Sequence, residues 1–343
     1  MSARSRVAVV LGAGGPVGHA FHAGVLAALC EEGWDGRNAD LLVGTSVGAI
    51  TAGLLRAGLA PGDLFAYTTN RALSDEGAAL LHKGWPDADF HVDLAQRRRH
   101  GPAAAPRLLA DLARSPRHVR AGLIMAALAP TGEVSTDIIT EGFGRILGPV
   151  WPQPSLLVSA VDLDAGTRVV FGAPGATRPD PGLAVAASCA VPSYFVPVQI
   201  AGRRYVDGGL FSPANTDLAG ADGHGYDIVL ASVPMGIGGW PNRRGLDLPG
   251  RLGNQRSARR GLRSFRRAGA VTATFAPGAA ELEVMRYDAF DFGHLPEIAY
   301  RAAAATRLRL RRDPELGALT EILRAHAAAP STGGTGAGAG GPT

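Results

Sequence analysis

The hydrophobic residues of this chain occur in short unbroken runs that alternate with segments of helical spacing. Residues 7–11 form an apolar run rich in β-branched side chains that stops at Gly12, a pattern typical of a buried parallel strand. From Phe21 the apolar side chains recur every four residues, and Gly33 follows as a candidate helix cap. The pattern therefore predicts a strand, a glycine loop and a helix, in that order.

A second unit of the same kind follows, and after it the pattern becomes helical. Residues 41–43 predict a short strand, and the apolar spacing over residues 47–55 predicts a helix that ends near Gly58. From about residue 59 to residue 132 the strand signals are weak and the periodicity is helical. We expect residues 59–132 to form a helical insertion over an α/β core.

Strand patterns return in the second half of the chain. They are expected at residues 155–161, 168–171, 196–200, 204–206 and 227–233, of which the last is the final clear strand. The alternation of strands and helices predicts an α/β fold with a mixed, mostly parallel sheet between helices. Residues 330–343 are mainly glycine and small residues with nothing to bury, so we expect a disordered tail after one domain over residues 1–329.

The composition fits one large folded domain. Of 343 residues, 46% are hydrophobic and 19% are charged, which suffices for a sizeable core and excludes wholesale disorder. The net charge of +4 is too small to suggest a nucleic-acid binder. Cys30 and Cys189 lack the spacing of a disulfide framework or a zinc site, and we expect no metal and no cofactor.

The apolar runs are too short for a membrane span. They fall far below the ~20 residues that cross a bilayer, and the run at residues 7–11 is too short for the core of a signal peptide. We therefore expect a cytoplasmic protein.

The strongest candidate for chemistry is a G-x-S-x-G pentapeptide at residues 44–48, between a predicted strand and a predicted helix. Such a turn holds a seryl hydroxyl at a helix N-terminus, where the helix dipole and the N–H of Val47 face a developing oxyanion. A glycine-flanked serine alone is also common in tight turns. The flanking strand and helix favour Ser46 as a nucleophile.

A glycine loop at residues 12–18 precedes this pentapeptide. Loops of this kind let backbone N–H groups converge on an anion at the start of a helix. A dinucleotide fingerprint would require a third glycine where Val17 stands. We favour an oxyanion loop beside Ser46, because the two strands that precede these motifs are expected to pair in one sheet.

A seryl nucleophile needs a group that accepts its proton. None of the nine histidines lies in a motif that marks it as that group, and we expect His19, His22 and His294 to be packed or surface residues. Asp207 is more suggestive because it ends a predicted strand and opens a D-G-G motif. Alone, a D-G-G sequence is usually a hairpin turn.

Together and in this order, the motifs resemble the patatin-like phospholipase family. The likeness is carried by residues 11–18 with 22–26, by residues 44–48, by residues 187–198, and by residues 205–210 with Pro213. It covers roughly residues 6–235, and the combination is highly specific. The resemblance implies a patatin-like three-layer fold.

The resemblance also implies a lipid acyl hydrolase that uses a Ser-Asp dyad without histidine. Ser46 matches the nucleophile and Asp207 the base, and the backbone of Gly14 and Gly15, with Val47, matches the oxyanion hole. The remaining motif positions are Gly18 in the loop, Gly44 and Gly48 around the nucleophile, and Gly208 and Gly209 in D-G-G. The implied reaction proceeds through an acyl-enzyme, on an acyl ester lipid such as a phospholipid, a lysophospholipid or an acylglycerol.

One position departs from the family pattern. The family usually has Arg or Lys where this chain has Val17, and Pro16 removes one possible N–H donor. The loop must then be held by something other than that charge. This departure bears on the efficiency of the oxyanion hole and on substrate range.

The small net charge conceals one basic segment. Residues 251–267 contain seven arginines and no acidic residue, and Ala258, Leu262 and Phe265 form an apolar stripe. This pattern predicts a basic amphipathic helix, which can lie on an anionic membrane but is more often an ordinary solvated helix. The membrane-facing candidates are Arg259, Arg260, Arg263 and Arg266.

Three other functions remain open at this point. A Ser-His-Asp α/β-hydrolase would need one of the histidines, of which His294 fits the chain order best. A Rossmann-type protein would bind a nucleotide at the glycine loop. A non-catalytic lipid-binding or regulatory member of the patatin-like family is suggested by Val17.

Overall fold

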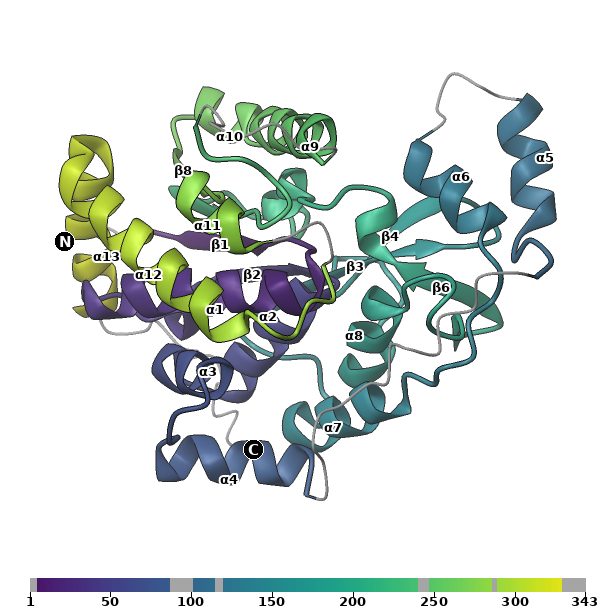
Figure 1. The fold of residues 1–343 in the computed structure, drawn as a ribbon, viewed down its shortest axis with the longest axis horizontal. Helices are drawn as coiled ribbons and strands as arrows, with labels where there is room; N and C mark the ends of the chain where they lie inside the picture. Colours follow the sequence, from purple (N-terminus) through teal and green to yellow (C-terminus); the bar gives the residue numbers. More distant parts are fainter. Residues whose placement is uncertain (1–4, 87–100, 115–119, 240–246, 286–288, 329–343) are drawn as a thin grey trace, which may run out of the picture.

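The computed structural model describes residues 5–86, 101–114, 120–239, 247–285 and 289–328. Within them, an eight-stranded sheet lies between helices on both of its faces (Figure 1). The strands are β1 (Val7–Leu11), β2 (Leu41–Thr45), β3 (Ser155–Asp162), β4 (Thr167–Phe171), β5 (Val198–Ile200), β6 (Arg203–Asp207), β7 (Ile228–Ser232) and β8 (Val271–Phe275).

The helices of the described residues are spread along the whole chain. Those in the first part are α1 (Gly15–Glu31), α2 (Val47–Ala57), α3 (Pro61–Thr68), α4 (Asp75–Gly84), α5 (Pro106–Arg114), α6 (Ala121–Leu128) and α7 (Asp137–Leu147). Those in the second part are α8 (Pro181–Cys189), α9 (Leu248–Gly261), α10 (Arg263–Arg267), α11 (Ala279–Val284), α12 (Leu295–Arg312) and α13 (Pro314–Ala328). Helix α1 begins at Gly15, earlier than the side-chain periodicity from Phe21 suggests, because Pro16 is well suited to a first helical turn.

The sheet is mixed and mostly parallel, as the sequence predicts. Its strand order is β5-β6-β3-β2-β1-β7-β8, with β4 paired to β3 beside this path. The ladders that join β3, β2, β1, β7 and β8 are parallel, and those of β3 with β4, β3 with β6 and β5 with β6 are antiparallel. The α/β fold class is therefore confirmed.

One strand was missed by the sequence patterns. The expectation that residues 227–233 are the last strand is wrong, because β8 (Val271–Phe275) extends the sheet beyond β7. Its sequence, VTATF, begins with an exposed valine, then alternates between half-buried and buried positions, and has large apolar side chains only at its ends. Pairing along a single edge stabilises a strand whose own hydrophobic signal is weak.

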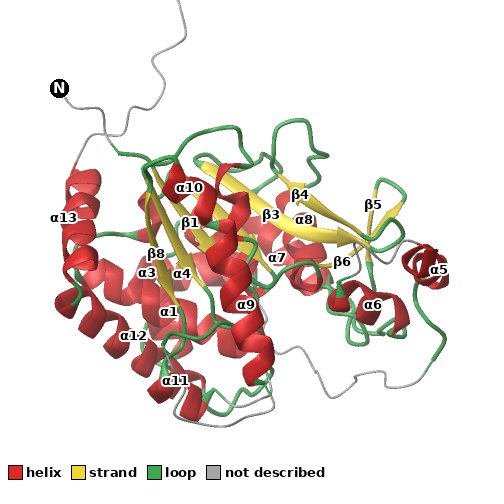
Figure 2. Cartoon of the chain, turned by 90° about the horizontal axis from the view of Figure 1, so that it is seen from above, coloured by secondary structure: helices red, strands yellow, loops and turns green. Residues whose placement is uncertain are grey.

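The two faces of the sheet bury alternate residues of the same strands. Val7, Val9 and Leu11 of β1 belong to a large core with helices α1, α2, α8 and α12. Ala8 and Val10 belong to a second core that contains residues of α9. This alternation, with side chains on opposite faces at successive positions, yields the three layers seen in Figures 1 and 2.

The described part of residues 59–132 is helical. Helices α3 and α4 contact α1 and α7, whereas α5 and α6 pack through a small core over the ends of β3 and β6. The extent of the domain and its division into core and insertion remain predictions. The tail predicted at residues 330–343 lies outside the described residues.

The basic segment does not present a free apolar stripe. It is divided between α9 and α10, and Ala258 and Leu262 are fully buried in the second core while Phe265 packs against that core. The expected amphipathic surface is therefore only partly right, because the protein itself covers its apolar side. The arginines at 256, 259, 260, 263, 266 and 267 are exposed.

The described helices include none that is both long and apolar enough to cross a bilayer.

Candidate active site

Along one edge of β3, two strands meet end to end. Residues 158–162 of β3 pair with β4 along one edge, so its other partners share the opposite edge. On that edge, β2 pairs with residues 155–159 and β6 pairs with residues 160–162. Thr45 is opposite Ser159, and Asp207 is opposite Ala160. Because β2 is parallel and β6 antiparallel to β3, the carboxyl ends of β2 and β6 point at each other, and Ser46 lies beside Asp207.

Ser46 sits in a strained turn between β2 and α2. It is the N-cap residue of α2 with φ 55° and ψ −127°, and it is 7% exposed. Residues other than glycine rarely adopt this backbone conformation. The surrounding structure must therefore hold Ser46 in place. A Cβ at Gly48 would overlap the Leu11 carbonyl, and one at Gly44 would overlap Ala49. Both glycines of the pentapeptide thus allow the close crossing of strand and helix.

Asp207 is a buried carboxyl with one oxygen left unpaired. Its Oδ1 accepts the N–H of Gly209 at 2.6 Å, whereas Oδ2 has no hydrogen-bond partner among the described residues. Burial raises the pKa of Asp207 to about 6, and interaction with Ser46 and the Gly209 N–H opposes that rise. The Ser46 side chain is thus near enough to affect this carboxyl, although it makes no well-formed hydrogen bond to Oδ2.

Gly208 and Cys189 are closely packed near Asp207. A Cβ at Gly208 would overlap the carbonyl oxygen of Ser159, so the chain passes directly against β3 there. Cys189 is 6% exposed, and burial followed by the nearby Asp207 charge raises the pKa of its thiol. Cys189 is therefore a protonated core thiol.

Backbone hydrogen bonds hold the start of the glycine loop. The N–H of Gly12 donates to Ser232 at 3.0 Å and that of Ala13 to Pro213 at 2.7 Å. In the described part of the chain, the N–H groups of Gly14, Gly15 and Val47 donate to no partner. Three backbone N–H groups without an acceptor among the described residues therefore lie at the adjacent N-terminal ends of α1 and α2.

The first turn of α1 contacts both the Ser46 turn and a distant segment. A Cβ at Gly18 would come within 3.3 Å of the Val47 side chain, so α1 packs against the start of α2. Gly15 has φ 59°, and its Cα faces the Ala289 carbonyl so closely that a Cβ would lie 2.6 Å from the oxygen. The N–H of Val17 donates to the same carbonyl at 3.3 Å. Val17 is itself 4% exposed, so apolar packing occupies the position at which the family pattern has a basic residue.

His22 is buried and holds the loop. Its Nε2 donates to the Gly12 carbonyl at 2.8 Å, which leaves Nδ1 to accept the Ser232 hydroxyl at 2.8 Å. Burial lowers the pKa of His22 to about 3, so the ring is neutral. Sequence reasoning expected a packed or surface residue and missed this contact, which joins positions 210 residues apart.

His19 and His294 also have partners other than Ser46. Nδ1 of His19 is 3.1 Å from the Thr51 hydroxyl, and Nδ1 of His294 is 2.9 Å from Asp291. Across the described ranges, no hydrogen bond of a histidine reaches Ser46. The arrangement therefore favours Asp207 over His294 as the partner of Ser46.

A buried polar network lies beneath the junction of β2 and β6. Nδ2 of Asn215 donates to the hydroxyls of Thr45 and Ser159, both at 3.1 Å, and these hydroxyls are 2.9 Å apart. Oδ1 of Asn215 accepts from Arg168 at 2.8 Å. No local sequence signal marks these residues, because their contacts join segments as many as 170 positions apart.

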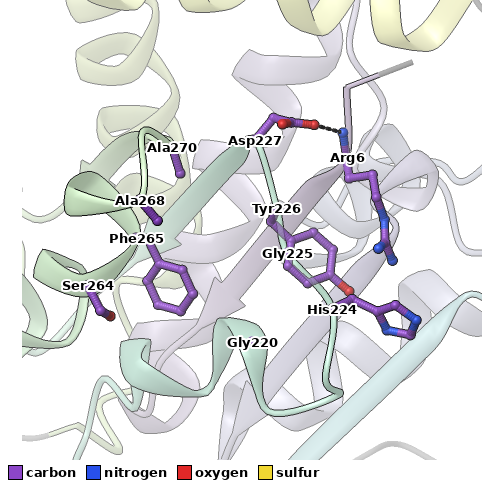
Figure 3. A pocket seen from close by; sticks show the side chains of 10 residues that line it. All are labelled: Arg6, Gly220, His224, Gly225, Tyr226, Asp227, Ser264, Phe265, Ala268 and Ala270. Atoms are coloured by element: carbon purple, nitrogen blue, oxygen red, sulfur yellow. Dashed lines mark hydrogen bonds between the residues drawn. The ribbon is translucent and has the colours of Figure 1, made fainter. Parts of the chain in front are cut away.

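A surface cavity lies at the other end of the sheet. It has a volume of about 580 Å³ and is lined by residues that directly precede β1 and β7, namely Arg6 and Asp227, together with Tyr226, His224 and residues of α10 (Figure 3). Ser46 follows the carboxyl end of β2, which runs parallel to β1 and β7 through the sheet. The cavity and α10 are therefore remote from Ser46 and Asp207.

The low pKa of His22 predicts a specific pH dependence of stability. Between pH 6.5 and about 3 the folded chain binds fewer protons at His22 than the unfolded chain does, so the free energy of unfolding falls as the pH is lowered through this window. Replacing His22 by Gln should flatten urea-unfolding free energies between pH 6.5 and 5 by about 1 kcal/mol per pH unit on average, because the unfolded imidazole takes up its proton gradually below pH 6.5. His82→Gln, at an exposed site on α4, should keep the wild-type slope. A His22→Gln slope equal to that of the wild type would contradict the assignment.

Comparison with known proteins agrees with this geometry. The family model described as "Patatin-like phospholipase" matches residues 9–219. Uncharacterized NTE family proteins of Mycobacterium bovis and Mycobacterium tuberculosis are 28% identical to the chain over 246 residues, which make up 71% of this chain and 52% of each relative. The chain thus spans about half the length of these curated relatives. On the family match, this chain belongs to the patatin-like phospholipase family, whose name implies lipid acyl hydrolysis.

Proposed function

We propose that this chain is a serine lipid acyl hydrolase, with Ser46 as nucleophile and Asp207 as base. The observation that carries the proposal is the junction of β2 and β6 on one edge of β3, where a strained serine lies beside a buried carboxyl. Nucleophile and base must lie within reach of each other for proton transfer. In this proposal the ends of β2 and β6 bring the two groups together, without a histidine.

The first half of the reaction forms an acyl-enzyme. Asp207 accepts the proton of the Ser46 hydroxyl as Oγ attacks the ester carbonyl carbon. The tetrahedral intermediate then collapses, the bond to the alcohol oxygen breaks, and the proton on Asp207 passes to the departing alcohol.

Water releases the acyl group in the second half. Asp207 takes a proton from a water molecule, whose oxygen attacks the acyl carbon. The bond to Oγ breaks, and the proton on Asp207 returns to Ser46 as the fatty acid leaves. The enzyme ends in its starting state, and the net reaction is ester plus water to acid plus alcohol.

The free backbone donors supply the oxyanion hole in this proposal. The N–H groups of Gly14, Gly15 and Val47 lie at the start of α1 and α2, whose dipoles favour negative charge. The N–H of Val17, by contrast, is occupied by the Ala289 carbonyl. A nucleotide phosphate at the first turn of α1 would compete with that carbonyl, which favours the hydrolase over the Rossmann-type alternative.

The substrate class is an acyl ester lipid: a phospholipid, a lysophospholipid or an acylglycerol, with simple carboxylic esters as smaller surrogates. A non-catalytic lipid-binding role, suggested by Val17, is less well supported because the loop keeps its unpaired donors without a basic residue. The family assignment supports lipid acyl hydrolysis, and the dyad and the lipid are our proposal.

Substitution of either member of the dyad should abolish activity. We expect Ser46→Ala and Asp207→Asn to reduce the hydrolysis of p-nitrophenyl acyl esters by at least ~10³-fold, since each removes a participant in bond making or proton transfer. A serine-directed fluorophosphonate should label the wild type and not Ser46→Ala. Retention of full activity in either variant would disprove the dyad.

Measuring the free energy of unfolding of each variant shows whether a loss of activity comes from the missing side chain or from unfolding of the protein. Because burial raises the folded pKa of Asp207 above its unfolded value, its charge at neutral pH disfavours the folded state. Asp207→Asn should therefore be at least as stable as the wild type at pH 7. His294→Gln is the matched control, and loss of its activity would favour the triad alternative.

The activity should depend on pH through the base. Asp207 accepts a proton only when ionised, so kcat/KM should fall tenfold per pH unit below the Asp207 pKa of about 6. The profile is measured with a soluble ester, corrected for stability at each pH. If kcat/KM falls only near pH 4, burial does not raise the pKa of Asp207 and this prediction is wrong.

We also propose a peripheral contact with an anionic membrane through Arg259, Arg260, Arg263 and Arg266. These side chains are exposed, and the segment that carries them contains no acidic residue. Because the apolar stripe is buried, this contact is electrostatic. It also lies away from Ser46, so it would hold the protein at a membrane without presenting the dyad to it.

Vesicle binding tests this contact. The triple variant Arg259→Gln, Arg260→Gln and Arg263→Gln should bind phosphatidylserine vesicles about 100-fold more weakly, at ~1 kcal/mol per arginine. Raising the salt concentration should also weaken vesicle binding by the wild type. The triple variant should hydrolyse soluble esters at the wild-type rate. Equal binding by the triple variant and the wild type would exclude the patch.

A further inference from the structure

The end of α8 contacts the backbone of both members of the proposed dyad. The N–H of Ser46 donates to the Ser188 hydroxyl at 2.8 Å, and that hydroxyl donates to the Ser159 carbonyl at 2.7 Å. Two residues further along, the carbonyl of Ala190 accepts the N–H of Asp207 at 3.0 Å. Ser188 is 0% exposed. One helix end therefore bridges the junction of β2 and β6.

The N–H of Ser46 depends on Ser188 for its hydrogen bond. The ladder between β2 and β3 ends at Thr45, and the next N–H, that of Ser46, donates to α8 instead. Without the Ser188 hydroxyl, the N–H of Ser46 and the carbonyl of Ser159 would each lose a hydrogen bond in the interior. Unpaired buried groups of this kind are costly, so the turn would shift to relieve them.

Helix α8 is a firm support. Its N-cap Asp180 accepts the N–H of Gly182, and a Cβ at Gly182 would overlap the Thr140 carbonyl of α7. Almost all of its residues are buried. A helix packed so tightly has little freedom to move, which keeps its last turn in place.

We propose that Ser188 is a positioning residue that fixes Ser46, while the Ala190 carbonyl fixes Asp207, so that the end of α8 sets the separation of nucleophile and base. This role rests on the proposed function. The proposal assigns a role to Ser188 and Ala190. Both lie in residues 187–198, a block of the family resemblance that contains neither the proposed nucleophile nor the proposed base. Proton transfer and attack need the reacting atoms within a few tenths of an ångström of their productive places, and a small displacement lowers the rate steeply.

The test compares Ser188→Ala with a matched variant elsewhere. Thr216→Val is the control, because the Thr216 hydroxyl is buried and donates to the Ala258 carbonyl at 2.8 Å between the 3-10 helix Thr216–Gly220 and α9. We expect Ser188→Ala to lower kcat for a soluble ester by about 10- to 100-fold with KM within about threefold of the wild type. Its rate of fluorophosphonate labelling should fall by a similar factor. Thr216→Val should lose stability alone.

Conservative variants show whether the hydroxyl itself is responsible. Ser188→Thr keeps the hydroxyl and should recover most of kcat where melting curves show that its methyl group is accommodated. Ser188→Cys has nearly the shape of serine but a weak hydrogen-bonding group, and its kcat should fall between those of wild type and Ser188→Ala. All assays are run at least 10 °C below the lowest melting midpoint.

Each outcome has a distinct meaning. A wild-type protein that neither hydrolyses esters nor reacts with the fluorophosphonate contradicts the proposed function, and the positioning role falls with it. An active wild type with Ser188→Ala equal to Thr216→Val overturns the positioning role alone, as does a raised KM at unchanged kcat. Should Ser188→Ala fail to fold, full kcat in Ser188→Cys overturns the role and a reduced kcat with unchanged KM supports it.

Discussion

Along one edge of β3, the hydrogen-bond ladder passes from β2 to β6 between Ser159 and Ala160. This shared edge is the constraint from which the site follows. Register in a sheet is strongly specified wherever a face is buried, because a slip by one residue turns every side chain to the opposite face. The register of the two ladders therefore brings Ser46 and Asp207 next to each other.

Because this junction is buried, some of its polar groups have no hydrogen-bond partner among the described residues. Oδ2 of Asp207 and the N–H groups of Gly14, Gly15 and Val47 make no hydrogen bond within the residues that the structure describes. Elsewhere the buried polar groups near the junction are paired, as in the contacts of Asn215 with Thr45 and Ser159. Unpaired groups cost stability, and under the proposed function they are retained where a charged transition state binds.

Local patterns in the sequence identified the elements that carry their own signal. The apolar run of β1 and the pentapeptide around Ser46 predicted a strand and a strand-to-helix turn, and both are present. Contacts between distant segments left no such signal, so the parts played by Ser188 and His22 were not foreseen. Strand β8 and the buried side of α9 were missed for the same reason, since neighbouring elements determine their burial. The roles of the dyad remain predictions from sequence that the geometry supports.

The glycine loop shows how the site can depend on residues beyond the family motifs. In place of a basic side chain at position 17, neutral contacts hold this loop: His22 and Ser232 on the side of Gly12, and the Ala289 carbonyl on the side of Gly15. Ser232 and Ala289 lie after residue 219, where the family match ends. Strand β7 and the segment before α12 therefore take part in shaping the loop. Changes in this later part of the chain can alter the proposed oxyanion donors while every motif residue stays the same.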